Sequence, residues 1–369
     1  MALSILKQAG FQVEISNEKA ISGTHKVNVT IVAEGILPIA ANAKGQGEYE
    51  HTKLNNEKII YQPLSLYPLY VNDLILALNS IEFSKYIILE DFHYLPQEPQ
   101  SDFSYTLKSF HENSDYVFII VGVWREENRL IGFNGDLTDP VQSINANTWT
   151  LFQLEEVIEA GEQLLNLRFA ESFKTNVIEQ SLETVHLVQE ACRSACREAS
   201  IIETIDGNTL EIAHDGEDAP RIVQELVNGK SGRYQGALKN ISEGFKDIDL
   251  EMPKWIIYAL LCFKEAEYEK GVKLRRMSRV MKAKHPRGKD LNNGSITQTL
   301  KGFGTLQNEK SVRPPIFEYD TTNRVLSVVD KGFMIWLKSQ DRNAIADDLD
   351  MVPLMTYADA AEIAGPQEY

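Results

Sequence analysis

A run of apolar residues that leads directly into two carboxylates constrains this chain more than any other feature. Residues 86–89 are apolar, and Glu90 and Asp91 follow them. A short apolar run of this kind predicts a strand that is buried on both faces. Ligands of open α/β sheets lie beyond the carboxyl ends of the strands, and Mg²⁺ is commonly held by one or two carboxylates together with substrate phosphates. Glu90 and Asp91 are therefore candidate catalytic residues and magnesium ligands.

The sequence after the two carboxylates predicts a second strand of the same sheet. Residues 97–114 place Phe103, Leu107 and Phe110 at helical spacing, and residues 116–121 form another continuous apolar run. Strand, helix and strand at this distance predict a βαβ unit and hence a parallel sheet. A plainer interpretation of the two carboxylates stays open, in which the strand simply ends at the solvent.

An apolar strand that ends in two acids is typical of the Walker B segment of a P-loop ATPase, but its usual companion is missing. No G-x-x-x-x-G-K-[ST] occurs in the 369 residues. In P-loop enzymes this segment supplies the lysine and the backbone amides that hold the phosphates. We therefore expect ATP and Mg²⁺ to bind this chain weakly or not at all.

Composition limits the compartment and the partners. No apolar run reaches the roughly 20 residues that span a bilayer, and the first residues do not form a signal peptide, so we expect a cytoplasmic protein without membrane contacts. Cys192, Cys196 and Cys262 are too few for a disulfide framework and lack histidines at metal-binding spacing. The net charge of −16 argues against nucleic-acid binding by the whole surface.

One stretch reverses this acidic balance. Residues 273–289 contain no acid, and residues 274–284 are predicted to be a helix. Such a helix is a candidate phosphate-binding surface, although a solvated helix face or an interface with the acidic remainder of the chain would explain it equally well. The candidate nucleic-acid contacts on it are Arg275, Arg276, Arg279, Lys282 and Lys284.

The surrounding elements predict a DNA-binding layout. Helices are expected over residues 255–265, 274–284 and 295–303, and a strand, a turn and a second strand over residues 316–329. Three helices and a hairpin are typical of a winged helix. Short polar side chains at the start of the third helix can reach base edges in the major groove, which makes Ser295, Thr297 and Gln298 candidates.

The remaining segments are less specific. Alternating residues predict strands over 11–16 and 26–33, and residues 22–58 are expected to form a β-hairpin insertion. Thr150 and Gln153 predict a capping box at the start of a long helical region. Asp206-Gly-Asn predicts a hairpin within residues 201–212.

Taken together, these segments resemble bacterial P-loop ATPases of the AAA+/STAND kind, especially a group found beside defence genes. The resemblance implies an incomplete α/β core with a parallel sheet over 1–148, an all-α lid over 149–245, a winged helix over 246–340 and an acidic tail over 341–369. It is carried by EDFHYL at 90–95, VGVWREEN at 121–128, NGDL at 134–137, LVQE at 187–190 and VDKGF at 329–333.

The chain departs from this family where the family does chemistry. It starts where the P-loop would end, which an internal start, a truncated gene or a true loss would explain. Residues 138–140 occupy the place of an arginine finger, and Gln189 that of the lid arginine. Trp124 and Asn128 fall near the sensor position, so these two residues and Gln189 are the sensor candidates.

Three functions follow as expectations. The first is a catalytically impaired ATPase-fold protein that acts as a regulatory or scaffolding component of a bacterial defence-type system. Such a protein is expected to self-associate or to bind a partner ATPase subunit. The second is an active ATPase whose P-loop is lost from this chain. The third is a nucleic-acid-binding protein that uses the winged helix on DNA.

Overall fold

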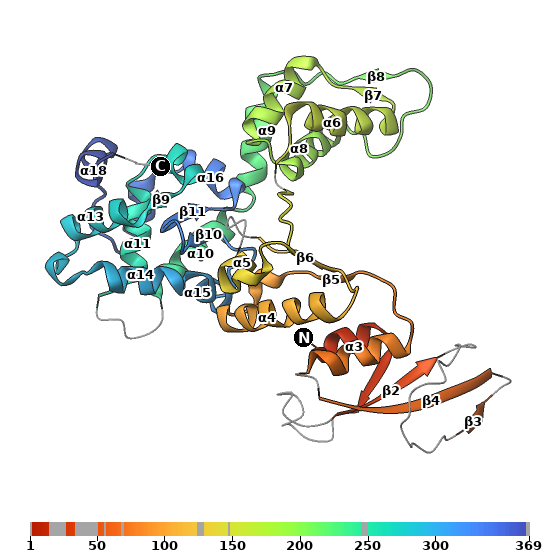
Figure 1. Ribbon diagram of the computed structural model, residues 1–369. Helices are drawn as coiled ribbons and strands as arrows, with labels where there is room; N and C mark the ends of the chain where they lie inside the picture. The colour runs from red at the N-terminus through yellow and green to blue at the C-terminus, as the bar shows by residue number, and fades with distance from the viewer. Residues whose placement is uncertain are drawn as a thin grey trace. The chain divides into compact units, whose positions relative to one another are not determined.

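The protein is described by a computed structural model in which contacts divide the chain into two units. Unit 1 comprises Met1–Gly122 and Asn128–Ser143, and unit 2 comprises Val123–Glu127 and Ile144–Tyr369. Both units mix helices and strands, and most of the described residues are helical (Figure 1). The structure describes residues 2–14, 27–33, 51–54, 57–67, 70–123, 129–146, 148–244 and 250–366, with the backbone alone for 12–14, 27–33, 51–66 and 269.

Unit 1 contains a four-stranded antiparallel sheet. Its strands run in the order β1-β2-β4-β3, and β2 pairs with β4 from Val27 opposite Leu66 to Ala33 opposite Ile60. The expected strands at 11–16 and 26–33 are present. Residues 22–58, which were expected to form a β-hairpin insertion, contribute β2, β3 and the start of β4 to this sheet, while residues 22–26, 34–50 and 55–56 lie outside the described residues. The strands are β1 (Phe11–Glu14), β2 (Val27–Ala33), β3 (His51–Leu54) and β4 (Glu57–Leu66).

The predicted βαβ unit is also present in unit 1. β5 and β6 pair in parallel, with Ile87 opposite Phe118, and α4 connects them. Among the described residues this parallel sheet has two strands, with Ile87 buried but Ile88 56% exposed and Ile119 42% exposed. The expectation of a strand buried on both faces is therefore met on one face only. The elements are α1 (Ala2–Gln8), α3 (Val71–Ser80), β5 (Ile87–Leu89), η1 (Phe92–Tyr94), α4 (Gln97–Asn113), β6 (Phe118–Ile120), α5 (Arg129–Phe133) and η2 (Gly135–Leu137).

Unit 2 begins with a helical region. The predicted capping box is present, since the Thr150 hydroxyl accepts from the Gln153 amide and the Gln153 side chain accepts from the Thr150 amide. The predicted hairpin over 201–212 is wrong, because Leu210 pairs in parallel with Leu167 across a long connection. The elements are α6 (Leu151–Leu165), β7 (Leu167–Arg168), α7 (Glu171–Gln180), α8 (Val185–Glu198), β8 (Leu210–Glu211) and α9 (Asp218–Asn228).

The second part of unit 2 alternates helices with three short strands. The strands form an antiparallel sheet in the order β10-β11-β9, in which Phe317 lies opposite Val328 and Val325 opposite Lys273. The predicted helices and the strand-turn-strand segment are all present. The elements are α10 (Ser231–Glu243), α11 (Met252–Leu261), α12 (Glu265–Lys270), β9 (Val272–Lys273), α13 (Leu274–Lys284), η3 (Gly288–Asp290), α14 (Asn293–Lys301), α15 (Phe303–Glu309), β10 (Phe317–Asp320), β11 (Val325–Val328) and α16 (Lys331–Lys338).

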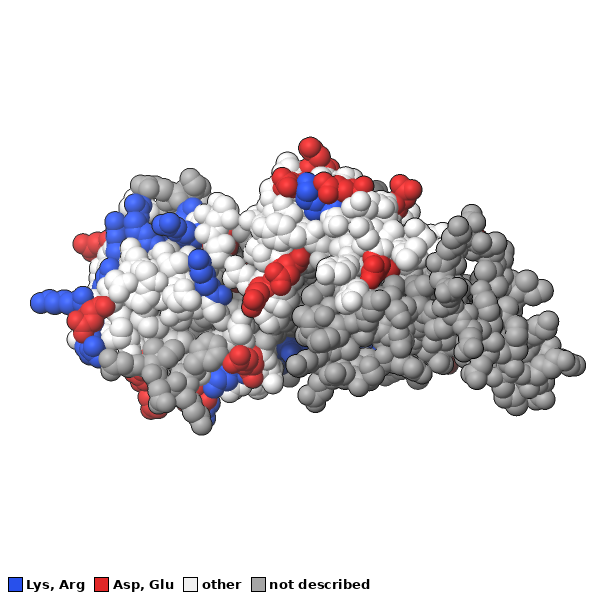
Figure 2. Space-filling view, turned by 60° about the horizontal axis from the view of Figure 1, so that its bottom comes forward, with Lys and Arg blue, Asp and Glu red and all other residues white. Residues whose placement is uncertain are grey.

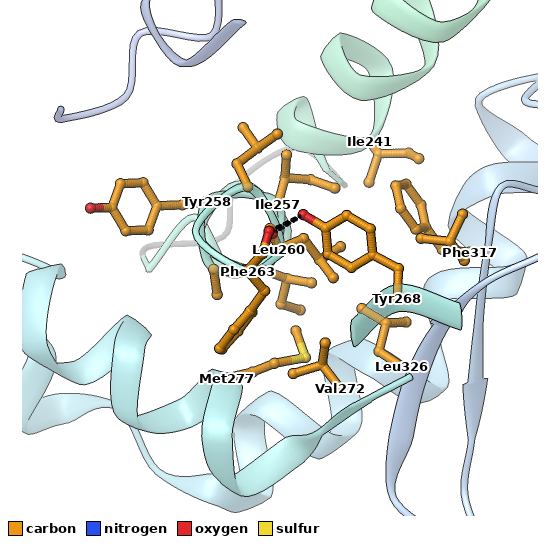
Figure 3. Packing of buried hydrophobic residues seen from close by; sticks show 14 of the residues in the cluster. Ile241, Ile257, Tyr258, Leu260, Phe263, Tyr268, Val272, Met277, Phe317 and Leu326 are labelled. Atoms are coloured by element: carbon orange, nitrogen blue, oxygen red, sulfur yellow. Dashed lines mark hydrogen bonds between the residues drawn. The ribbon is translucent and has the colours of Figure 1, made fainter. Parts of the chain in front are cut away.

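Helix α11 is the centre of the core of this second part. Ile256, Ile257 and Tyr258 have no exposed surface. Figure 3 shows the surrounding side chains converging on α11, with the hydroxyl of Tyr268 donating to the carbonyl of Leu260. A helix that is apolar on all sides must be buried on all sides, so α11 fixes the positions of the helices and the sheet around it.

The expectation of an acidic tail after residue 340 is wrong for the described residues. Residues 342–348 form α17 (Arg342–Asp348), and residues 357–364 form α18 (Tyr357–Ala364). Asp341 and Thr356 cap the two helices with their side chains. Ala346, Ala360 and Ala364 are fully buried, and Ile345, Leu349 and Met355 are also buried, so large and small apolar residues both pack this segment into the core. Among the described residues, no helix has the length and apolar character needed to cross a membrane.

Candidate nucleic-acid interface and carboxylate pair

The basic helix α13 has two distinct faces. Leu274, Met277 and Met281 recur at helical spacing, and all are buried, which attaches the helix to the core. At about 100° per residue, Arg275, Arg279 and Lys282 fall together on the opposite side, and all three are exposed. Figure 2 shows Lys and Arg side chains gathered at the left end of the view, where Figure 1 places α13 and α14.

Arg276 does not belong to this surface, which corrects its prediction as a phosphate contact. Its side chain is only 5% exposed and forms an ion pair with Glu267. Its Nε donates to the carbonyl of Gly365 at 3.0 Å, and its guanidinium lies 5.0 Å from the centre of the Phe263 ring. A buried guanidinium needs partners for its donors, and Arg276 finds them inside the protein. It is one position from Arg275 in sequence but about 100° away around the helix.

Two of the exposed cations also contact neighbouring segments. Nη1 of Arg279 donates to the carbonyl of Ala364 at 2.8 Å, and Nζ of Lys282 donates to Oδ1 of Asn293 at 3.3 Å. Lys284 is exposed at the end of α13. Arg275, Arg279 and Lys282 thus form a surface set, which we call the basic face, whereas Lys284 lies on the other side of the helix by the same angular spacing.

Helix α14 carries the three predicted base-edge candidates. Asn292 caps it by accepting from the Ser295 amide at 2.8 Å, and Ile296 and Leu300 are buried against the core. The hydroxyl of Ser295 donates to the carbonyl of Asn292, and that of Thr297 donates to the carbonyl of Asn293 at 2.7 Å. Gln298 is exposed and is the longest of the three. The first residue of α14, Asn293, joins this helix to α13, because its Oδ1 accepts from Ser278 and from Lys282.

The hairpin after α15 is fixed by a residue that the sequence did not single out. Gln307 is fully buried, its Nε2 donates to the carbonyl of Phe317 at 2.7 Å, and its Oε1 accepts from the amides of Ile316 and Phe317. A glutamine on a helix gives no local signal of such a role, because its partners are backbone groups about ten residues away.

The carboxylate pair lies at the carboxyl end of β5, as predicted. Glu90 and Asp91 are both exposed, and Asp91 adopts a left-handed conformation with φ of 56° before η1. Short polar residues such as aspartate tolerate this conformation better than most. Among the described residues, no group of three or more His, Cys, Asp or Glu side chains is placed to hold a metal ion.

The neighbouring His93 has no acid–base partner. Both of its ring nitrogens are buried, and neither has a hydrogen-bond partner among the described residues. Burial lowers the pKa of His93, and the nearby Asp91 only partly opposes this effect. A neutral, packed histidine fits this environment better than a general base.

The three sensor candidates stay predictions. Trp124 and Asn128 lie outside the described residues. Gln189 is exposed on α8 in unit 2, whereas Glu90 and Asp91 belong to unit 1. The basic face and the α14 candidates lie together in unit 2, and Glu90 and Asp91 lie together in unit 1.

Comparisons with known proteins do not add a family to this picture. No protein-family model, no curated protein and no solved structure matches this chain.

Proposed function

We propose that this protein binds duplex DNA through residues 252–338, folded as a winged helix. The observation that carries the proposal is the order of elements: helix α11, strand β9, helices α13 and α14, and the hairpin β10–β11, with β9 completing the sheet beside β11. A winged helix places its third helix in the major groove and uses the preceding helix and the hairpin beside it. In this arrangement α14 is the helix that enters the groove.

The charge of this region supports a polyanionic partner. Residues 252–340 contain 17 Lys and Arg against 8 Asp and Glu, a net charge of +9 within a chain of −16. Phosphate contacts supply most of the affinity of DNA-binding proteins, and polar side chains on the inserted helix supply the specificity. The basic face of α13 is suited to the first role, and Ser295, Thr297 and Gln298 are suited to the second.

The salt dependence of DNA binding tests this proposal. Each neutralised phosphate lowers log K by about 0.9 per unit of log salt on duplex DNA. Replacing Arg275, Arg279 and Lys282 together by alanine should flatten that slope by up to about three units and weaken all sequences alike. Fluorescence anisotropy of labelled duplexes over a salt series measures both quantities.

A matched control separates the basic face from total charge. Replacing Arg193, Arg197 and Lys230 by alanine also removes three positive charges, but from exposed positions of the helical region. We expect this variant to keep the wild-type slope. Equal slopes and affinities for the wild type and the basic-face variant would reject the proposal and leave α13 as a solvated face or a protein interface.

A second candidate function rests on the parallel unit β5–α4–β6. We propose that unit 1 is a P-loop ATPase-like core of the AAA+/STAND kind that turns over no ATP in this chain and serves as a regulatory or scaffolding component. Two exposed carboxylates at the carboxyl end of β5 support it, while the sequence contains no G-x-x-x-x-G-K-[ST] to hold phosphates. Purified protein should show no ATP turnover above background, and a clear rate that Asp91→Ala abolishes would disprove this.

A further inference from the structure

The acidic end of the chain lies against the basic helix. Residues 341–366 contain six acids and one arginine, and they fold as α17 and α18 instead of extending into solvent. Ala360 and Ala364 are four positions apart, so they share one face of α18, and both are fully buried. Helix α18 is thus packed on α13 through small side chains, with opposite net charges on the two segments.

The contact is made by arginines of α13 and the carboxyl end of α18. The last carbonyls of a helix have no partner within it and carry partial negative charge. At this end, Arg276 donates to the carbonyl of Gly365 and Arg279 to that of Ala364. Gly365 has φ of +72°, and a Cβ there would lie 2.6 Å from Nη1 of Arg279. The glycine therefore permits the close approach of Arg279.

The position of α18 places it at one border of the basic face. Lys282 contacts Asn293 of α14, and Arg279 contacts the end of α18. The two helices lie on opposite sides of the stripe formed by Arg275, Arg279 and Lys282, as the angular spacing of these contacts around α13 requires. A phosphate that binds Arg279 competes with the carbonyl of Ala364 for this guanidinium. The helix that holds this carbonyl packs against α13 and carries Asp359 and Glu362.

We propose that α18 is an autoinhibitory element that restrains DNA binding by occupying Arg279 and placing acidic residues beside the basic face. The proposal rests on the DNA-binding function proposed above. Strong binding of DNA displaces α18 from α13, and loss of α18 docking strengthens the binding of DNA.

A negative charge placed on the buried face of α18 tests the autoinhibitory element, because autoinhibition and simple repulsion predict opposite changes in DNA affinity. Ala364→Asp puts a carboxylate into the contact with α13 and should release α18. Simple repulsion predicts weaker DNA binding from an added negative charge, whereas release of Arg279 predicts tighter binding. We expect a lower dissociation constant for Ala364→Asp than for the wild type at every salt concentration, because binding no longer has to displace α18. The salt slope should be unchanged, because both complexes contain the same phosphate contacts.

Ala361→Asp is the matched control, because it adds the same charge at an exposed position of the same helix. It should bind DNA like the wild type or slightly more weakly. Circular dichroism and thermal melting establish that both variants are folded. Hydrogen exchange of the unmodified protein gives a second measurement, in which the amides of residues 357–364 should exchange faster when duplex DNA is added.

The possible results distinguish failure of the autoinhibitory element from failure of the proposed DNA-binding function. Tighter binding by Ala364→Asp, with faster exchange of α18 in the DNA complex, supports the autoinhibitory element. If the wild type binds DNA with the expected salt slope but Ala364→Asp binds equally or more weakly, or if DNA leaves α18 exchange unchanged, the element is refuted and DNA binding stands. If neither protein binds DNA, the proposed function fails and the inference fails with it.

Discussion

Arg342 anchors the C-terminal helices, and its replacement by methionine gives the sharpest test of how they are held. The side chain is only 7% exposed at the start of α17. Nη1 donates to the carbonyl of Leu261 at 3.1 Å and to the hydroxyl of Tyr268 at 3.2 Å, and it also donates to the carbonyl of Phe263. Nη2 forms an ion pair with Glu265. One guanidinium therefore satisfies the end of α11 and the start of α12.

The expected cost follows from these partners. Methionine fills much of the space of the arginine stem but donates nothing. Removing one member of a buried ion pair costs roughly 3–5 kcal/mol, and a carbonyl left buried without a partner costs about 1–3 kcal/mol. Glu265 is 31% exposed and can regain water, which lowers the first contribution. We expect a loss of about 3 kcal/mol for Arg342→Met, and hence a drop in melting temperature of about 6–12 °C.

Urea unfolding followed by tryptophan fluorescence measures this change. Trp255 and Trp336 are buried in unit 2 and report on its core. Arg197→Met is the matched control, since it makes the same chemical change at an exposed arginine, and it should stay within about 0.5 kcal/mol of the wild type. A similarly small change for Arg342→Met would show that α17 and α18 contribute little to the stability of unit 2.

Three further substitutions test individual groups. Gln307→Leu should destabilise unit 2 by about 2–3 kcal/mol, because it leaves amides and a carbonyl of the segment at Phe317 without partners; an unchanged urea midpoint would contradict this. Hydrogen bonds from Arg221 hold the pKa of Glu198 down at about 2, so this carboxylate stabilises the fold above its usual pKa and ceases to do so as the pH falls towards 2. Between pH 5 and pH 2 the melting temperature of Glu198→Gln should therefore fall less steeply than that of the wild type. Parallel plots of melting temperature against pH for the two proteins would refute this stabilising role of Glu198. His93→Phe should leave stability equal or higher, since it removes two buried nitrogens that lack partners among the described residues; a clear loss in melting temperature would point to an unseen polar contact.

The sequence by itself predicted those elements whose signal is local. Apolar residues at helical spacing predicted α4, and the capping box of Thr150 and Gln153 marked the start of α6. The turn at 321–323 between two apolar runs predicted the pairing of β10 with β11. The apolar runs at 86–89 and 116–121 predicted a parallel pair, and β5 and β6 form one. Periodicity and turn chemistry act over a few residues, which explains why these predictions hold.

Tertiary structure decided which residues share a surface. Arg275 and Arg276 are neighbours of the same type, yet Arg275 is exposed, whereas Arg276 is buried and contacts Gly365, Glu267 and Phe263. Residues 341–366 are acidic, and their composition predicted a tail, yet Ile345, Leu349 and Met355 are buried in the core. Helices of seven and eight residues are marginal alone, and α17 and α18 are stabilised by the contacts of Arg342 and by the burial of Ala360 and Ala364. Such contacts join residues about 80 positions apart, and no local pattern in the sequence encodes them.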